Sequence, residues 1–148
     1  MKQKKILIWL CAIAVVAGLT ASFLRPISLI RHKDFRVLTV SYSDGENERL
    51  ITEDLDLEQV GKILAHTQCR RRIEPMLWPG FRAEQLRYDI SIFYPTTGDH
   101  VTIYLGLSDE IGEDTIMNKA YRNNSGLFNF CWRILEPDAL ISALDSLH

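Results

Sequence analysis

The sequence predicts an α+β fold, in which an N-terminal transmembrane helix precedes a mostly antiparallel sheet with two helices on one face. Three observations predict it. An uncharged, apolar run of 19 residues occupies Ile6–Leu24. After this run, several short segments alternate apolar and polar residues and are separated by turn residues, as in hairpin-linked strands. Only two later segments have helical spacing, so the regular alternation of strand and helix that predicts a parallel sheet is missing.

Charge divides the chain of 148 residues into a basic leader and an acidic body. Residues 1–33 contain six Lys/Arg and no acid, whereas residues 34–148 contain the other 11 Lys/Arg and all 19 Asp/Glu, a net charge of −8. An acidic body excludes a general nucleic-acid binder, because such a protein needs clustered positive charge against phosphates. The hydrophobic share of 47% also excludes a disordered chain.

The apolar leader is long enough to cross a membrane. As a helix, Ile6–Leu24 would extend about 28 Å at ~1.5 Å per residue, close to the ~30 Å hydrocarbon core of a bilayer. We therefore expect residues 1–24 to be a basic tail and a retained anchor, with the lipid bilayer as partner. A cleaved signal peptide is the alternative, although its apolar region usually spans only ~7–15 residues.

The orientation of the anchor depends on the positive charges at its two ends, which are nearly balanced. They are Lys2, Lys4 and Lys5 on one side and Arg25, Arg31, Lys33 and Arg36 on the other. A short basic tail before an apolar run is typical of an export signal, so we expect a cytoplasmic N-terminus and an extracytoplasmic body. The inverted topology, with the body in the cytoplasm, stays open. Residues 25–34 are expected to be a juxtamembrane linker and 35–148 a single domain.

The body is expected to begin with a hairpin. Phe35–Tyr42 alternates in the manner of a half-buried strand, with Leu38 and Val40 on one face and Val37 on the other. Asp44-Gly45 then supplies the residue types that tolerate the positive φ of a tight turn. The residues after this turn are interpreted as a short return strand.

A short helix is expected over 57–67. Asp56 followed by Gln59 forms a capping box at its start, and apolar residues then repeat at helical spacing. Gly61 in the middle of the helix weakens it by up to ~1 kcal/mol relative to alanine. Its presence indicates that the helix approaches the sheet closely at this point.

The second half of the body is expected to contain most of the sheet. The expected strands are Cys69–Ile73, Leu86–Tyr94, Val101–Leu107, Thr115–Tyr121 and Leu127–Ile134. The second and third alternate strictly and are separated by Pro95-Thr96-Thr97-Gly98-Asp99, which predicts an antiparallel hairpin. The final helix begins at Glu136-Pro137, where a proline in the first turn costs little because its missing N–H would be unpaired there in any case.

No motif for catalysis or metal binding is present in the sequence. No serine and acid lie at the spacing of a nucleophilic triad with His66, His100 or His148. His66 is expected near the end of a helix, where a positive charge interacts favourably with the helix dipole. Neither Cys-x-x-Cys nor His-Glu-x-x-His occurs, so no metal or other cofactor is expected. The acidic segment 109–114 lacks the alternating ligands of a calcium loop and is interpreted as a solvated loop.

A run of three arginines is the candidate site for an anionic group or for lipid phosphates. The candidate residues are Arg70, Arg71, Arg72 and Trp78. The simpler interpretation is that these arginines form ordinary surface pairs with acids such as Glu74 and Glu84, which contribute little to stability.

Two cysteines of the body are candidates for a disulfide. If the body is exported to an oxidising compartment, a bond between Cys69 and Cys131 would close a loop of 63 residues. In the chain-entropy model it would stabilise the fold by about 4 kcal/mol. The alternative is that both remain thiols, with Cys131 on the strand face opposite Trp132 and therefore outside the main core.

The layout resembles small extracytoplasmic domains of unknown function that follow one anchor or lipid signal in Gram-positive bacteria. The similarity rests on the leader, on Ile51–Ala65 and on Gly126–Leu144. The resemblance implies an envelope location, and it assigns no site residue because such families have no assigned activity. The leading hypothesis is a membrane-tethered domain that binds another envelope protein or a peptide. The alternatives are a small envelope enzyme, such as a hydrolase with scattered site residues, and a tethered domain that faces the cytoplasm.

Overall fold

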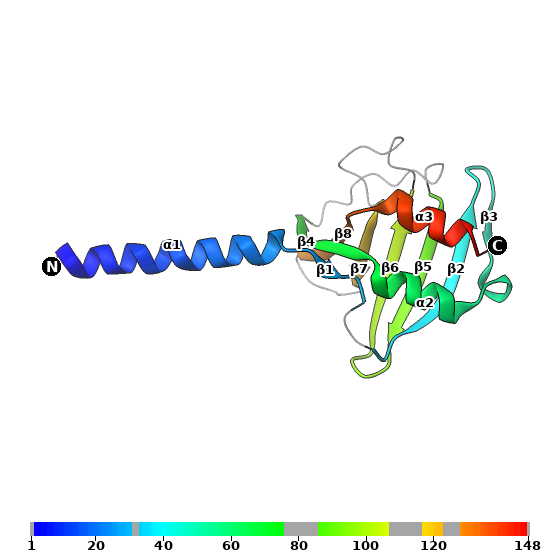
Figure 1. Ribbon diagram of the computed structural model, residues 1–148, viewed down its shortest axis with the longest axis horizontal. Helices are drawn as coiled ribbons and strands as arrows, with labels where there is room; N and C mark the ends of the chain where they lie inside the picture. The colour runs from blue at the N-terminus through cyan, green and yellow to red at the C-terminus, as the bar shows by residue number, and fades with distance from the viewer. Residues whose placement is uncertain (1, 31–32, 76–85, 107–116, 123–127, 148) are drawn as a thin grey trace.

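The computed structural model describes residues 2–30, 33–75, 86–106, 117–122 and 128–147 (Figure 1). The helical elements are α1 Lys2–Leu24, η1 Thr52–Asp54 (a single 3-10 turn), α2 Leu57–His66 and α3 Pro137–Asp145. The strands are β1 Ile27–Ser28, β2 Arg36–Ser43, β3 Glu48–Leu50, β4 Gln68–Pro75, β5 Tyr88–Tyr94, β6 Asp99–Leu105, β7 Lys119–Arg122 and β8 Phe128–Ile134.

The body is one antiparallel sheet with two helices on one face. In the described part of the chain the sheet has eight strands, in the order β1-β4-β8-β7-β6-β5-β2-β3, and every neighbouring pair is antiparallel. Figure 1 shows α2 and α3 lying across the same face of the sheet, while α1 extends away from the body. The α+β fold expected from the sequence is confirmed.

The core lies between the sheet and these two helices. Along β5 and β6 alternate residues are buried, which is the period of two that the sequence predicts. The fully buried strand residues include Val40, Tyr88, Ile90, Ile92, Ile103 and Leu105. They meet the apolar residues of the two helices, which include Val60, Leu64, Leu140, Ile141 and Leu144. Burial of this surface is the main favourable contribution to folding.

The start of α2 follows the capping pattern expected from the sequence. The Asp56 carboxylate accepts hydrogen bonds from the backbone N–H groups of Glu58 at 2.9 Å and Gln59 at 3.3 Å. The Gln59 side chain donates to the same carboxylate at 3.0 Å. These bonds satisfy N–H groups that have no partner inside the helix. They also keep the pKa of Asp56 below its usual value, with the Gln59 side chain as the largest cause.

The expected faces of β2 are wrong at one end because the strand contains a bulge. The register between β2 and β5 shifts between Val37 and Thr39, so Leu38 is the extra residue. Val37 lies opposite Ile92 and packs against the core. Leu38 is instead 42% exposed, although strict alternation places it with Val40 on the buried face.

The strand expected over Thr115–Tyr121 corresponds to β7, which begins at Lys119, while residues 115 and 116 lie outside the described residues. Asn118 directly before it has a φ of 57°, which ends the extended conformation. Its side-chain oxygen accepts a hydrogen bond from the Gly106 N–H at 3.0 Å, and its carbonyl accepts one from the Ile134 N–H at 2.8 Å. One buried asparagine therefore connects the end of β6, the start of β7 and the end of β8.

Gly61 makes a close contact, as expected, but the contact is with the ring of Phe35, which lies directly before β2. A Cβ atom at this position would lie 3.2 Å from Cζ and 3.3 Å from Cε2 of Phe35. Both residues lie at the α2 side of the core, where Phe35 is partly buried. A larger side chain at position 61 therefore has to displace the ring.

We expect Gly61→Leu to lower the free energy of unfolding by about 2 kcal/mol, because overpacking displaces Phe35. The measurement is urea unfolding of the full chain in detergent micelles. Phe35→Ala should itself destabilise, but the double variant should be less destabilised than the sum of the two single variants. Additive effects would contradict a direct contact between the two side chains.

Candidate functional site

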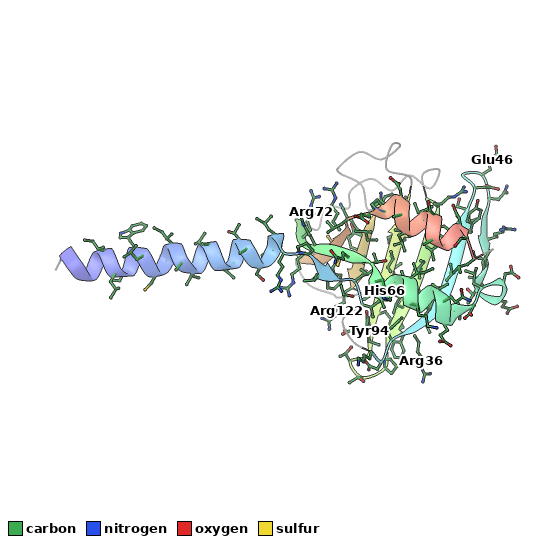
Figure 2. The ribbon with its side chains drawn as sticks, in the orientation of Figure 1. Arg36, Glu46, His66, Arg72, Tyr94 and Arg122 are labelled. Atoms are coloured by element: carbon green, nitrogen blue, oxygen red, sulfur yellow. The ribbon has the colours of Figure 1, made fainter. Side chains whose placement is uncertain are left out.

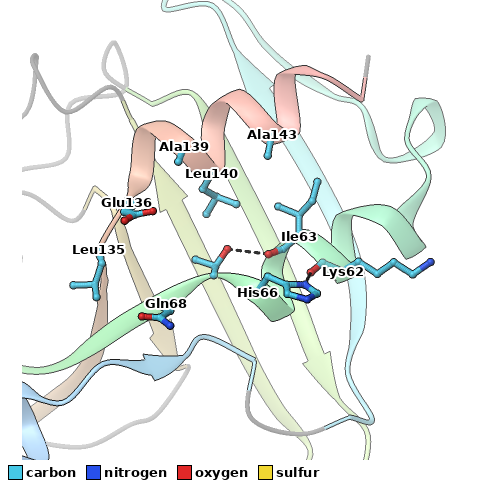
Figure 3. A pocket seen from close by; sticks show the side chains of 10 residues that line it. Lys62, Ile63, His66, Gln68, Leu135, Glu136, Ala139, Leu140 and Ala143 are labelled. Atoms are coloured by element: carbon cyan, nitrogen blue, oxygen red, sulfur yellow. Dashed lines mark hydrogen bonds between the residues drawn. The ribbon is translucent and has the colours of Figure 1, made fainter.

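A groove of about 650 Å³ lies between the end of α2 and the start of α3 (Figure 3). Its lining includes Ile63 and His66 from α2, Gln68 from β4, and Ala139, Leu140 and Ala143 from α3. Figure 3 shows Ile63 and Leu140 pointing toward each other between the two helices. The groove has the volume of a typical ligand or peptide site, and its floor is apolar.

The local sequence explains why this space is not filled. Ala139 and Ala143 are one helical turn apart, so their methyl groups share the face of α3 that borders the groove. Larger side chains at these two positions would close it. The strand ends below are fixed, because the Leu135 N–H donates a hydrogen bond to the Gln68 carbonyl at 3.1 Å.

Charged and polar side chains form the rim. His66 ends α2, as the sequence predicts, and its Nδ1–H donates to the Lys62 carbonyl at 2.7 Å. This bond leaves Nε2 as an exposed acceptor in the neutral ring. Lys62 forms an exposed ion pair with Glu58 at 2.7 Å, which is weak enough to be exchanged for another anion. Glu136 lies across the groove at the start of α3.

The described groups around His66 do not form a nucleophilic triad. Within the described residues no carboxylate orients the His66 ring, so the pairing of a base with an orienting acid is not assembled in the groove. His100 is exposed on β6 and contacts the Phe93 ring, with 4.8 Å between the ring centroids. His148 lies outside the described residues. In the part of the chain that the structure describes, no group of three or more His, Cys, Asp or Glu is placed to hold a metal ion.

The three arginines do not form one cluster. Arg70 pairs opposite Arg133, Arg71 opposite Trp132 and Arg72 opposite Cys131 in the β4–β8 ladder. Because side chains alternate along a strand, Arg71 lies on the helix-covered face and the other two lie on the opposite face. The Arg71 guanidinium donates to the Ser22 hydroxyl of α1 at 3.2 Å. Figure 2 shows Arg72 at the end of the body nearest α1.

Several residues named as candidates from the sequence lie outside the residues that the structure describes. Trp78, Glu84 and the acidic segment 109–114 lie outside the described residues, as does the side chain of Glu74. The expected surface pairs with Glu74 and Glu84 therefore stay predictions. For the two cysteines, Cys69 and Cys131 are both thiols rather than a disulfide.

The positions of these two cysteines explain why no bond joins them. Cys69 lies opposite Ile134 on β8, three residues beyond Cys131, and the two side chains point to opposite faces of the sheet. Both are nearly inaccessible, with 0% and 1% of their surface exposed. Cys131 is buried outside the main core cluster, on the face where the sequence places it.

Sequence reasoning missed a polar row across the sheet face that α2 and α3 leave uncovered. Asp89 pairs opposite Tyr104, which in turn pairs opposite Lys119. Lys119 is only 3% exposed, an unusual position for a lysine. Burial, together with the negative charge of Glu48, raises the pKa of Asp89 to about 6. The available signal was a charged residue near the start of an otherwise uncharged strand, at Asp89 of β5.

The comparisons with known proteins leave the function to be inferred from the chain itself. No family model, no curated protein and no solved structure matches this chain. The groove between α2 and α3, the arginines near α1 and the Asp89 row are therefore the features from which a function has to be argued.

The raised pKa of Asp89 predicts a stability that depends on pH. The folded state holds this proton more tightly than the unfolded chain, whose aspartates have a pKa near 3.8. Stability is therefore fully present below about pH 4 and declines as the pH rises through 6. Solvent screens part of the effect, because the carboxyl is only half-buried.

We expect Asp89→Asn to raise the unfolding midpoint at pH 8 by roughly 3 °C, the size of an effect near ~1 kcal/mol. The gain should vanish at pH 4, where Asp89 is protonated. Thermal unfolding of the full chain in detergent at both pH values measures it. Asp54→Asn, at an exposed aspartate, is the control and should change the midpoint little at either pH. An equal gain at both pH values would contradict the titration of Asp89.

Proposed function

We propose that this chain is a single-pass membrane protein whose extracytoplasmic body binds another envelope protein or a peptide through the groove between α2 and α3. The observation that carries the proposal is the combination of one exposed apolar helix with an open, apolar groove on the body. The first feature supports attachment to a bilayer, and the second supports binding of a partner.

The exposed surface of α1 supports the anchor. Ile6–Leu24 has a mean hydropathy of 2.4, and no part of this window is buried against the body. Trp9 is 71% exposed and Leu7 is 63% exposed. A contiguous apolar surface of this length is unfavourable in water and favourable in hydrocarbon. A signal sequence near the N-terminus has the same features. Its apolar region is usually only ~7–15 residues long, so the 19 residues of Ile6–Leu24 favour a retained anchor.

Charge supports an extracytoplasmic body. Lys2, Lys4 and Lys5 give the N-terminal tail a concentrated positive charge before the first apolar residue. The acidic residues of the body do not oppose its translocation, because acids contribute little to membrane orientation. The positive charges after α1 act in the other direction, so the orientation requires a direct test.

The groove favours a peptide segment as its occupant. Its apolar floor accepts one or two apolar side chains, and its lining spans two helices, which is how proteins commonly bind a short amphipathic segment. Lys62 and His66 provide positive charge and a hydrogen-bonding ring along one edge. We therefore expect the bound segment to carry an acidic residue beside its apolar side chains.

The topology is tested by fusing alkaline phosphatase after His148, because that enzyme is active only where its disulfides can form. We expect an active fusion that stays in the membrane fraction after carbonate washing. Replacing Lys2, Lys4 and Lys5 by glutamine should lower the activity, because it weakens the positive-inside signal. An inactive but abundant fusion would place the body in the cytoplasm, and a soluble one would contradict the anchor.

The groove is tested with a photo-crosslinking residue in place of Ala143 in the full chain. In cells that make the protein naturally, we expect a discrete adduct with a second polypeptide. The adduct should disappear when Ala139→Trp fills the groove, a larger side chain at a position where only a methyl group lies. The control position is Ser142, which is exposed next to Ala143 and should give no such adduct.

Two results would contradict the groove as the binding site. One is an adduct that persists unchanged in the Ala139→Trp variant, because the partner would then bind elsewhere. The other is an adduct with a second copy of this chain, which would make the groove an interface of a homo-oligomer.

A further inference from the structure

A second hollow lies at the junction between α1 and the body. Its volume is about 570 Å³, and its lining includes Gly18, Ala21 and Ser22 of α1, Arg25 after it, and Arg71 of β4. The hydrogen bond from Arg71 to Ser22 holds β4 against the end of α1. Figure 1 shows that β4 and β1 are the strands at this end of the body. The hollow therefore lies where the anchor leaves the membrane.

The depth of these residues follows from the helix rise. With Leu24 as the last residue of the candidate span, Arg25 lies at the boundary between hydrocarbon and water. Ser22 is about 4.5 Å and Gly18 about 10.5 Å deeper than Arg25 at ~1.5 Å per residue. The hollow thus reaches from the level of the lipid head groups into the hydrocarbon. A lipid molecule is also polar at one end and apolar at the other.

The polar end of the hollow carries two positive charges without a carboxylate partner. In the described part of the chain neither Arg25 nor Arg71 forms an ion pair with an acid. The contact with Ser22 occupies only part of the Arg71 guanidinium, which has five N–H donors. Guanidinium groups bind phosphate oxygens with paired hydrogen bonds. The two arginines are therefore suited to one phosphate group.

The apolar end is open because the residues of α1 on this side are small. Gly18, Ala21, Ser22 and Arg25 follow each other at helical spacing and share one face of the helix. Apart from the neighbouring backbone of α1 itself, no described atom lies within 4 Å of the place where a Cβ of Gly18 would be. This face leaves a channel along the helix in which an acyl chain fits.

The opposite face of β4 independently favours a negatively charged surface nearby. Arg70 pairs directly opposite Arg133, and like charges at such positions destabilise a sheet. Both side chains are exposed, and neither has an acidic partner among the described residues. Anionic lipid head groups beside this strand would offset the repulsion, because they attract each basic residue near the bilayer surface.

We propose that the junction hollow binds one anionic phospholipid, with Arg25 and Arg71 contacting its phosphate and an acyl chain lying along Gly18 and Ala21. This inference depends on the anchor part of the proposed function and on neither the groove nor the side on which the body lies. The lipid orients the body relative to the bilayer, because its phosphate contacts both Arg25 at the end of the anchor and Arg71 in the sheet.

The test measures the lipid preference of the full chain in detergent by native mass spectrometry. Phosphatidylglycerol and phosphatidylcholine with the same acyl chains are the probes. We expect phosphatidylglycerol to bind roughly 10- to 30-fold more tightly, the factor that two such contacts give. In the Arg25→Gln/Arg71→Gln variant the two lipids should bind alike. The control Arg36→Gln/Arg49→Gln removes the same charge from exposed positions on β2 and β3 and should keep the preference.

A second variant distinguishes a lipid site of defined shape from non-specific attraction between the arginines and anionic lipids. Gly18→Leu keeps both guanidinium groups and improves the helix, but its side chain fills the channel. We expect it to weaken phosphatidylglycerol binding at least several-fold. Unchanged binding would overturn the proposal, because charge alone would then hold the lipid.

Two further readouts complete the test. Millimolar inorganic phosphate should not displace the lipid, and displacement would show a site for free phosphate instead. Flotation with vesicles separates this inference from the proposed function. A chain that fails to float contradicts the anchor itself, whereas a chain that floats but binds both lipids equally contradicts the lipid site alone.

Discussion

The pairing of β5 with β6 is the constraint on which the rest of the structure depends. The two strands are antiparallel neighbours over their whole length, and alternate residues on one face of both are buried. The outer strands continue this register on each side, and α2 and α3 cover the buried face. The Tyr88 hydroxyl also donates to the Asp145 carboxylate at 2.5 Å, which fixes the end of α3 to β5. Burial and this bond raise the pKa of Tyr88.

Apolar side chains fill the core between the sheet and the two helices, so candidate binding sites lie at the periphery of the body. The face beneath the helices is closed by apolar residues, so on this side of the sheet the described residues leave the gap between the helix ends and the edges of the sheet for a ligand. At the β3 edge, Glu48 and Arg49 place charges on a strand of three residues, a feature that discourages pairing with another sheet. At the opposite edge, β1 and β4 adjoin the anchor. Both candidate sites lie on this second side of the body.

Patterns confined to one segment could be predicted from the sequence. The strict alternation around Ile90 and Ile103 and the cap at Asp56 depend on residues close in the chain, and the structure has both. The bulge at Leu38 could not be predicted, because it depends on which residue of β5 lies opposite each residue of β2. The separation of Arg71 from Arg70 and Arg72 follows from the alternation of side chains along β4, so the expected strand Cys69–Ile73 already implied it. Which of the two faces the helices cover depends on the packing of distant segments and could not be predicted.

Sites formed between distant segments could not be predicted from the sequence, for a related reason. The groove forms because Ile63 of α2 and Leu140 of α3 lie close together in space. Along the chain, most strands of the sheet lie between these two helices. The burial of Asp89 depends on the elements around it and leaves no local pattern beyond a charge in an apolar strand. Short motifs therefore do not reveal these two features, because each forms where separate elements adjoin.

The anchor and the groove are connected through a short series of hydrogen bonds. The Ser28 hydroxyl donates to the Ala65 carbonyl at 3.0 Å, and the Leu29 N–H donates to the Thr67 carbonyl at 2.9 Å, so the segment that follows α1 is fixed to the end of α2. Strand β4 makes a second connection. Gln68 lines the groove and Arg71 lines the junction hollow, three residues and about 10 Å apart at ~3.3 Å per residue.

With α1 in its proposed role as a membrane anchor, this spacing holds the groove at a short, constant distance from the membrane surface. A freely tethered domain would present its groove in every direction, whereas a domain fixed to its anchor by Arg71 and Ser28 presents it at the height of the bilayer boundary. Restricting a binding site to this layer raises the effective concentration of any partner that is itself confined to the membrane. The geometry therefore favours a partner segment presented at the membrane surface over one that diffuses freely in the compartment.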